Sequence, residues 1–129
     1  MSPVAFNHTI VHAIDREESA RFFSEMFALA EPYEFGPFLV CDLAHGASFD
    51  FIANPDPFPA QHYAFLVTEA EFDSILARIR GRGLEYWADP ARTEPNTINR
   101  HFGGRGVYWC DPSGHFLEAI TVPYGGWKA

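Results

Sequence analysis

Hydrophobic and polar positions follow the same order twice along the chain. The run from Asn7 to Asp15 matches the run from Gln61 to Glu69 without a gap, and each begins with a side-chain amide followed by histidine. Each run continues with residues suited to a buried strand and ends in an acidic residue that can open a helix. Such an internal repeat indicates a duplicated structural unit.

A helical spacing of apolar residues follows both runs. It comprises Phe22, Phe23 and Met26 in the first half, and Ile75, Leu76 and Ile79 in the second. Apolar residues three and four positions apart share one face of a helix, so the pattern predicts amphipathic helices over 16–30 and 69–82. The second helix runs into Gly81 and Gly83, and glycine is typical of a helix C-terminus.

Strand-like segments come after each predicted helix, at 33–35, 38–43 and 48–53 in the first half and at 85–88, 106–110 and 116–122 in the second. The last segment of each half carries one acid among apolar residues, Asp50 and Glu118 respectively. A tight-turn signal at 111–114 precedes the final strand. The order predicts a βαβββ unit written twice, which is an α+β fold with mixed sheets.

A proline-rich connector at 55–60 separates a first module at about 4–54 from a second at about 61–123. Neither module has enough core to fold alone, so we expect one domain over 1–129. The modules either pack together or exchange partners in a homodimer. A second long loop, 89–104, carries Arg, Asn and His and is suited to lie over a cavity.

Composition narrows the class of protein. The 129 residues are 47% hydrophobic with a net charge of −8, which argues against nucleic acid as a partner. No apolar run reaches the roughly 18 residues of a membrane span, and no signal-peptide pattern opens the chain. Two distant cysteines in apolar runs fit buried free thiols. We therefore expect a cytoplasmic protein without a membrane partner.

Strand alternation places candidate metal ligands at equivalent positions of the repeat. His8 and His62 occupy the same place in their strands, and Asp50 and Glu118 the same place in theirs. Taken singly, a strand histidine is more often a hydrogen-bonded core or rim residue, and Glu118 alone fits an edge-strand surface charge. The agreement between the two halves favours a divalent metal bound by His8, His62 and Glu118.

These residues resemble the vicinal oxygen chelate superfamily, which includes glyoxalase I, fosfomycin-resistance thiol transferases, extradiol dioxygenases and bleomycin-resistance proteins. The resemblance covers nearly the whole chain and is carried by Asn7–Val11, Gln61–Phe65 and Gly106–Glu118. It implies paired modules in a cupped, partly open mixed β-barrel. It also implies a metal held by the two histidines and Glu118, a small-molecule substrate that chelates the metal through adjacent oxygens, and a homodimer.

Within this superfamily the reaction stays open between isomerase, lyase, transferase and dioxygenase chemistry, because the sequence does not choose between Fe, Zn, Ni and Mn. Asp50 occupies the place of a carboxylate ligand of glyoxalase I but is one methylene shorter than Glu. We expect it to accept a hydrogen bond beside the metal, with direct ligation as the alternative.

Three further residues are candidates for substrate contact or proton transfer. His101 lies in a polar loop that runs into glycines, and it is the candidate catalytic group, with a solvated loop histidine as the alternative. Arg105 stands near the expected cavity. Tyr108 is placed to hydrogen-bond an oxygen at the metal, or else is a core tyrosine with its hydroxyl at the rim. His12 is expected in the cavity wall, and His45 and His115 in solvent-exposed turns.

The main rival to a metalloenzyme is a non-catalytic protein of the bleomycin-resistance type that sequesters a small molecule or antibiotic in an aromatic cleft. Trp87, Trp109 and the thirteen Phe residues would suit stacking on a flat ligand. The filled metal-ligand positions favour the enzyme.

Overall fold

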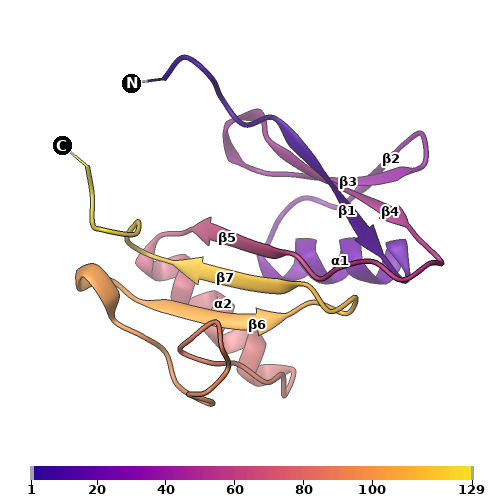
Figure 1. Cartoon of the computed structure of the whole chain (residues 1–129). Helices are drawn as coiled ribbons and strands as arrows, with labels where there is room; N and C mark the ends of the chain where they lie inside the picture. Colours follow the sequence, from indigo (N-terminus) through magenta and orange to yellow (C-terminus); the bar gives the residue numbers. More distant parts are fainter. Residues whose placement is uncertain (1, 129) are drawn as a thin grey trace. The chain divides into compact units, whose positions relative to one another are not determined.

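The computed structural model describes residues 2–128, which form two compact units divided between Pro59 and Ala60 (Figure 1). In the first unit the elements are β1 (His8–Ala13), α1 (Arg16–Met26), β2 (Tyr33–Phe35), β3 (Phe38–Asp42) and β4 (Ser48–Ala53), with a 3-10 turn at Ala44–Gly46. The sheet order is β1-β4-β3-β2, in which β1 runs parallel to β4 and the other pairs are antiparallel.

The second unit repeats this order with one strand fewer. It contains β5 (His62–Leu66), α2 (Glu69–Gly81), a 3-10 turn at His101–Gly103, β6 (Gly106–Cys110) and β7 (Phe116–Ile120). The sheet order is β5-β7-β6, with β5 parallel to β7 and β6 antiparallel to it. These mixed sheets and helices confirm the predicted α+β class.

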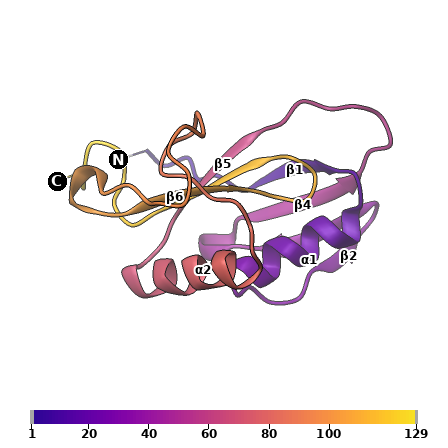
Figure 2. The same cartoon turned by 90° about the horizontal axis from the view of Figure 1, so that it is seen from below.

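Each helix lies along one face of its own sheet (Figure 2). In the first unit Phe23 of α1 stacks on Phe49 of β4, with ring centroids 4.9 Å apart, and it also packs against Phe51. In the second unit the buried face of α2 is formed by Phe72, Ile75, Leu76 and Ile79. Since strand side chains alternate between faces, the histidine and acid positions of β1, β4, β5 and β7 point away from the helices.

Side chains fix where the helices begin. The Asp15 carboxylate accepts from the backbone N–H of Glu18 and starts α1. Thr68 and Glu71 form a reciprocal capping box at the start of α2. No helix among residues 2–128 is long and apolar enough to cross a membrane.

The predicted end of the first helix and one predicted strand are wrong, and the last strand ends at Ile120 rather than at residue 122. The first helix ends at Met26 rather than near residue 30, because the chain leaves the helical conformation at Ala28, whose φ is +53°. The segment 85–88 forms no strand of its own. Trp87 makes an isolated pair of backbone hydrogen bonds with Tyr108. The backbone groups of the residues on either side of Trp87 are hydrogen-bonded to the loop that follows.

Candidate functional site

The parallel register of β5 and β7 brings a histidine and a glutamate of the second unit together. Ala64 lies opposite Glu118, so His62, two residues earlier, shares the same face of the sheet. His62 Nε2 is 2.8 Å from Glu118 Oε1. The His62 side chain is 44% exposed whereas that of Glu118 is 1% exposed, so the pair reaches from the interior to the surface.

Two tyrosines complete the surroundings of Glu118. The Tyr124 hydroxyl lies 2.7 Å from Oε1 and 2.6 Å from Oε2 of this carboxylate, so it is shared between both oxygens. Tyr108 lies opposite Glu118 in the β6–β7 pairing. Its hydroxyl is 3.5 Å from that of Tyr124, and its ring meets the His62 ring edge-on at 5.9 Å.

Burial and the neighbouring acid keep both phenols protonated. Burial raises the pKa of Tyr108, and its hydrogen bonds to Tyr124 and Glu118 raise it further. Burial also raises the pKa of Tyr124, to which the hydrogen bond to Glu118 adds. Because a tyrosine ordinarily titrates near pH 10, both hydroxyls are hydrogen-bond donors at neutral pH.

The equivalent positions of the first unit make different contacts. In the β1–β4 pairing Ile10 lies opposite Asp50, so His8 and Asp50 occupy the places that His62 and Glu118 occupy in β5 and β7. His8 Nδ1, however, lies 2.6 Å from the Asn7 side-chain oxygen, and Asp50 accepts from the Ser48 hydroxyl at 2.8 Å. The repeat therefore holds in register but not in side-chain contacts.

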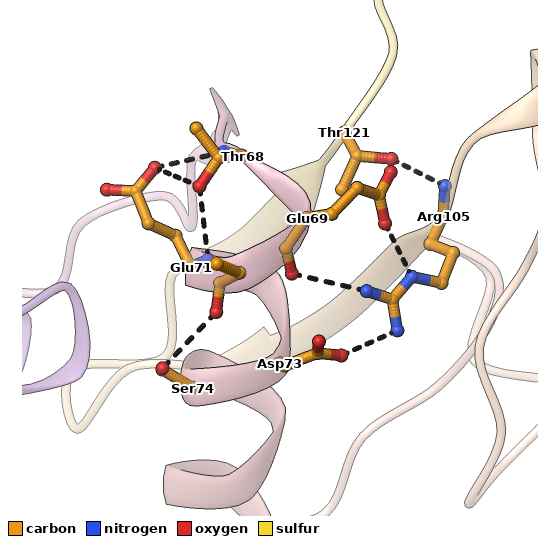
Figure 3. Close-up of polar contacts among 8 residues, drawn as sticks. Thr68, Glu69, Glu71, Asp73, Ser74, Arg105 and Thr121 are labelled. Atoms are coloured by element: carbon orange, nitrogen blue, oxygen red, sulfur yellow. Dashed lines mark hydrogen bonds and ion pairs between the residues drawn. The ribbon is translucent and has the colours of Figure 1, made fainter.

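Arg105 is engaged by the first turns of α2 (Figure 3). Its guanidinium lies 2.8 Å from Glu69 Oε1 and 2.8 Å from Asp73 Oδ1, and 4.5 Å above the Phe72 ring. Its backbone N–H donates to the Thr121 hydroxyl. These contacts tie the start of β6 to α2.

The other histidines singled out in the sequence lie outside the cluster around Glu118. His101 is exposed in its 3-10 turn, where its backbone N–H donates to the Asn99 side chain at 3.3 Å. His12 lies within 3.3 Å of the Asn54 amide. The expectation of a solvent-exposed His115 is wrong. His115 is 1% exposed, because its ring accepts the Gln61 backbone N–H and helps join the turn before β7 to β5.

Tyr124 is the member of this cluster that the sequence analysis did not identify. It follows β7 by four residues, within a turn in which the Gly126 N–H donates to the Pro123 carbonyl. Gly125 and Gly126 have φ values of +80° and +88°, a conformation that glycine adopts readily. The sequence Pro-Tyr-Gly-Gly just after the acid-bearing strand was the available signal.

His62 and Glu118 of the second unit are suitable ligands for a divalent metal. An imidazole nitrogen and a carboxylate oxygen lie 2.8 Å apart here, and both are atom types that bind divalent transition metals. Glu118 is a buried acid for which metal binding would supply a strong partner. Neither unit by itself gathers three His, Cys, Asp or Glu side chains around one point within residues 2–128.

Solved structures with high similarity to the chain are named as oxidases. The chain is 55% identical to oxidase ChaP-H1, with a TM-score of 0.93 over 95% of this chain and 99% of that one. It is 46% identical to oxidase ChaP-H2, with a TM-score of 0.94 over 97% and 98% of the two chains. These similarities extend over nearly the full length of both proteins.

Further proteins are similar to the chain at lower identity. A glutathione transferase, FosA of Serratia marcescens, is 28% identical over 120 residues, which are 88% of this chain and 78% of that protein. A lactoylglutathione lyase of Agrobacterium tumefaciens has the same fold at 19% identity, with a TM-score of 0.70 over 93% and 95% of the chains. No protein-family model matches the chain.

Proposed function

We propose that this chain, which belongs to the vicinal oxygen chelate superfamily, acts as a metal-dependent enzyme. The chain is proposed to be a divalent-metal-dependent oxidase that acts on a small molecule carrying two adjacent oxygens. The observation that carries the metal site is the contact between His62 and the buried carboxylate of Glu118. The oxidase reaction is supported by the two ChaP relatives, whose identity to this chain is well above that of FosA.

His8 is proposed as the third ligand because it occupies in β1 the place that His62 occupies in β5. The ligand set would then be two neutral imidazoles and one carboxylate, which leaves other positions for substrate. His8 would come from the same chain or from the partner in a homodimer. Bound there, a divalent ion supplies Lewis acidity, and iron(II) also supplies a site for dioxygen.

The chain's own residues bind and orient the substrate beside the ligands. The hydroxyls of Tyr108 and Tyr124 are protonated donors next to Glu118, so they can hydrogen-bond a substrate oxygen. Asp50 is proposed to accept a hydrogen bond near His8, and His101 and Arg105 to contact the substrate. Arg105 would have to give up part of its ion pairing with α2 to do so.

The test of the metal site is elemental analysis of protein purified without oxygen. We expect close to one metal ion per chain, and Glu118→Gln should lose most of it. Asp50→Asn is the matched control, since it replaces the register-equivalent acid. Equal losses in the two variants would make Asp50 a direct ligand. A wild-type chain that takes up no metal would support the binding-protein alternative.

The identity of the metal tests the oxidase reaction separately. Iron(II) is expected, together with oxygen consumption once a substrate is supplied. Exclusive binding of zinc or nickel would leave a metalloenzyme but would contradict the oxidase proposal.

The proposed setting is a cytoplasmic homodimer. Cys41 and Cys110 are free thiols, which fits a reducing compartment. Burial raises the pKa of Cys41 to about 12, so this thiol stays protonated and unreactive.

A further inference from the structure

Tyr124 makes the closest contacts to Glu118. Its hydroxyl lies 2.7 and 2.6 Å from the two carboxylate oxygens, so it is nearly equidistant from them and is shared by both. His62 Nε2 lies 2.8 Å from Oε1. Both oxygens of the acid are therefore already hydrogen-bonded by side chains of the second unit.

The turn that carries Tyr124 is separate from the strands that carry the other members of the cluster. It spans 123–126 and is closed by one backbone hydrogen bond of 2.9 Å, from Gly126 N–H to the Pro123 carbonyl. Tyr124 as a whole residue is 59% exposed, whereas Glu118 is fully buried. The tyrosine thus reaches into the protein from an exposed turn, and its hydroxyl can be withdrawn without opening the sheet.

We infer that the Tyr124 hydroxyl and a metal ion compete for the carboxylate of Glu118, so that the turn 123–126 sets the affinity of the site. This inference rests on the proposed metal site. In this inference, a cation that takes the part of Glu118 facing Tyr124 displaces the shared hydrogen bond. Tyr124 is then a positioning residue: it orients the Glu118 carboxylate, and when displaced it provides a phenol donor beside the ligands.

The decisive variant is Tyr124→Phe, which keeps the ring and removes only the hydroxyl. Zinc binding is measured by calorimetry at pH 8, where imidazole is neutral. A hydrogen bond to a charged group is lost in the variant, so zinc should bind about 10- to 100-fold more tightly than to wild type. Unchanged or weaker binding would overturn the inference, since it would mean that Tyr124 leaves the acid unobstructed or supports it.

Tyr33→Phe is the matched control. Its hydroxyl donates to the Asp42 carboxylate at 2.9 Å in the first unit, so the chemical change is the same at an acid that is not a proposed ligand. This variant should bind zinc like wild type. A wild-type chain that binds no zinc would contradict the proposed metal site, whereas zinc binding that does not respond to Tyr124→Phe would contradict only the competition.

A second measurement needs no variant. In amide NMR spectra of the wild-type chain, zinc should shift the signals of Gly125 and Gly126 together with that of His62. If the His62 signal moves while both glycine signals stay in place, the turn does not respond to the metal and the inference fails.

Discussion

Arg105 is proposed to contact substrate, and its ion pairs in the structure give a second, measurable expectation, which concerns stability. The substitution Arg105→Met keeps a long aliphatic side chain against Phe72 and removes the charge that faces Glu69 and Asp73 (Figure 3). We expect this variant to be less stable but to bind metal like wild type.

The loss in stability follows from the contacts of the guanidinium. The Asp73 side chain is 67% exposed, and ion pairs at such sites contribute about 0.2–1 kcal/mol. The cation–π contact with Phe72 adds about 0.5–1 kcal/mol. A sum of about 1–2 kcal/mol, divided by an unfolding entropy of about 0.27 kcal/mol/K for 129 residues, lowers the melting temperature by about 4–7 °C.

The assay is thermal unfolding followed by circular dichroism, with zinc calorimetry on the same samples. Arg100→Met is the control, because it removes an equal charge from an exposed loop position. High salt should reduce the difference in melting temperature between wild type and Arg105→Met, since exposed ion pairs are screened. An unchanged melting temperature of Arg105→Met would refute the structural role of these ion pairs.

Acidic pH should reduce the difference in melting temperature between wild type and Arg105→Met. The Thr121 hydroxyl and then Arg105 lower the pKa of Glu69 from its usual 4.5. A carboxyl whose pKa is lower in the folded state stabilises the fold above its usual pKa. That contribution is lost as the pH falls through the lower, folded value. The melting temperatures of the two proteins should therefore lie closer together in strong acid, while a constant gap would mean that the ion pair between Glu69 and Arg105 does not stabilise the fold.

Two further outcomes test local features of the second unit. Thr68→Ala removes the hydroxyl that accepts the Glu71 N–H, so unfolding by urea should show a loss of about 1 kcal/mol, and no loss would mean that the capping box is unimportant to α2. The Thr93 hydroxyl and the backbone N–H groups of its turn lower the pKa of Asp89, so this turn should loosen only as the pH falls below the usual value of 3.8. NMR titration of the Thr93 amide checks this, and a midpoint at or above 3.8 would contradict it.

The sequence predicted the parts of the fold that depend on periodicity. Both helix starts, the strand 106–110 and the strand 48–53 were expected where the structure has them, because apolar spacing and an acidic or hydroxyl residue determine them locally. The end of α1 was missed because Ala28, not glycine, adopts the left-handed conformation there. Segment 85–88 has the alternation of a strand, but the backbone groups on either side of Trp87 are hydrogen-bonded to the loop that follows instead of forming a continuous strand pairing.

The candidate site was predictable only in part. The repeat places His62 and Glu118 on one sheet face, and the structure brings them into contact. Their contact with Tyr124 depends on a turn that brings the chain back after β7, which no periodic pattern encodes. The ion pairs of Arg105 depend on how α2 lies beside β6, so a charge that looked available in the sequence is engaged in the folded unit.

The most direct test of the metal site is a crystal structure of the metal-loaded protein with anomalous diffraction recorded at the absorption edge of the bound metal. We expect one strong peak per chain, bonded to His62 Nε2, to an oxygen of Glu118 and to His8 of the same chain or of a partner. A peak at other side chains, or none at Glu118, would contradict it.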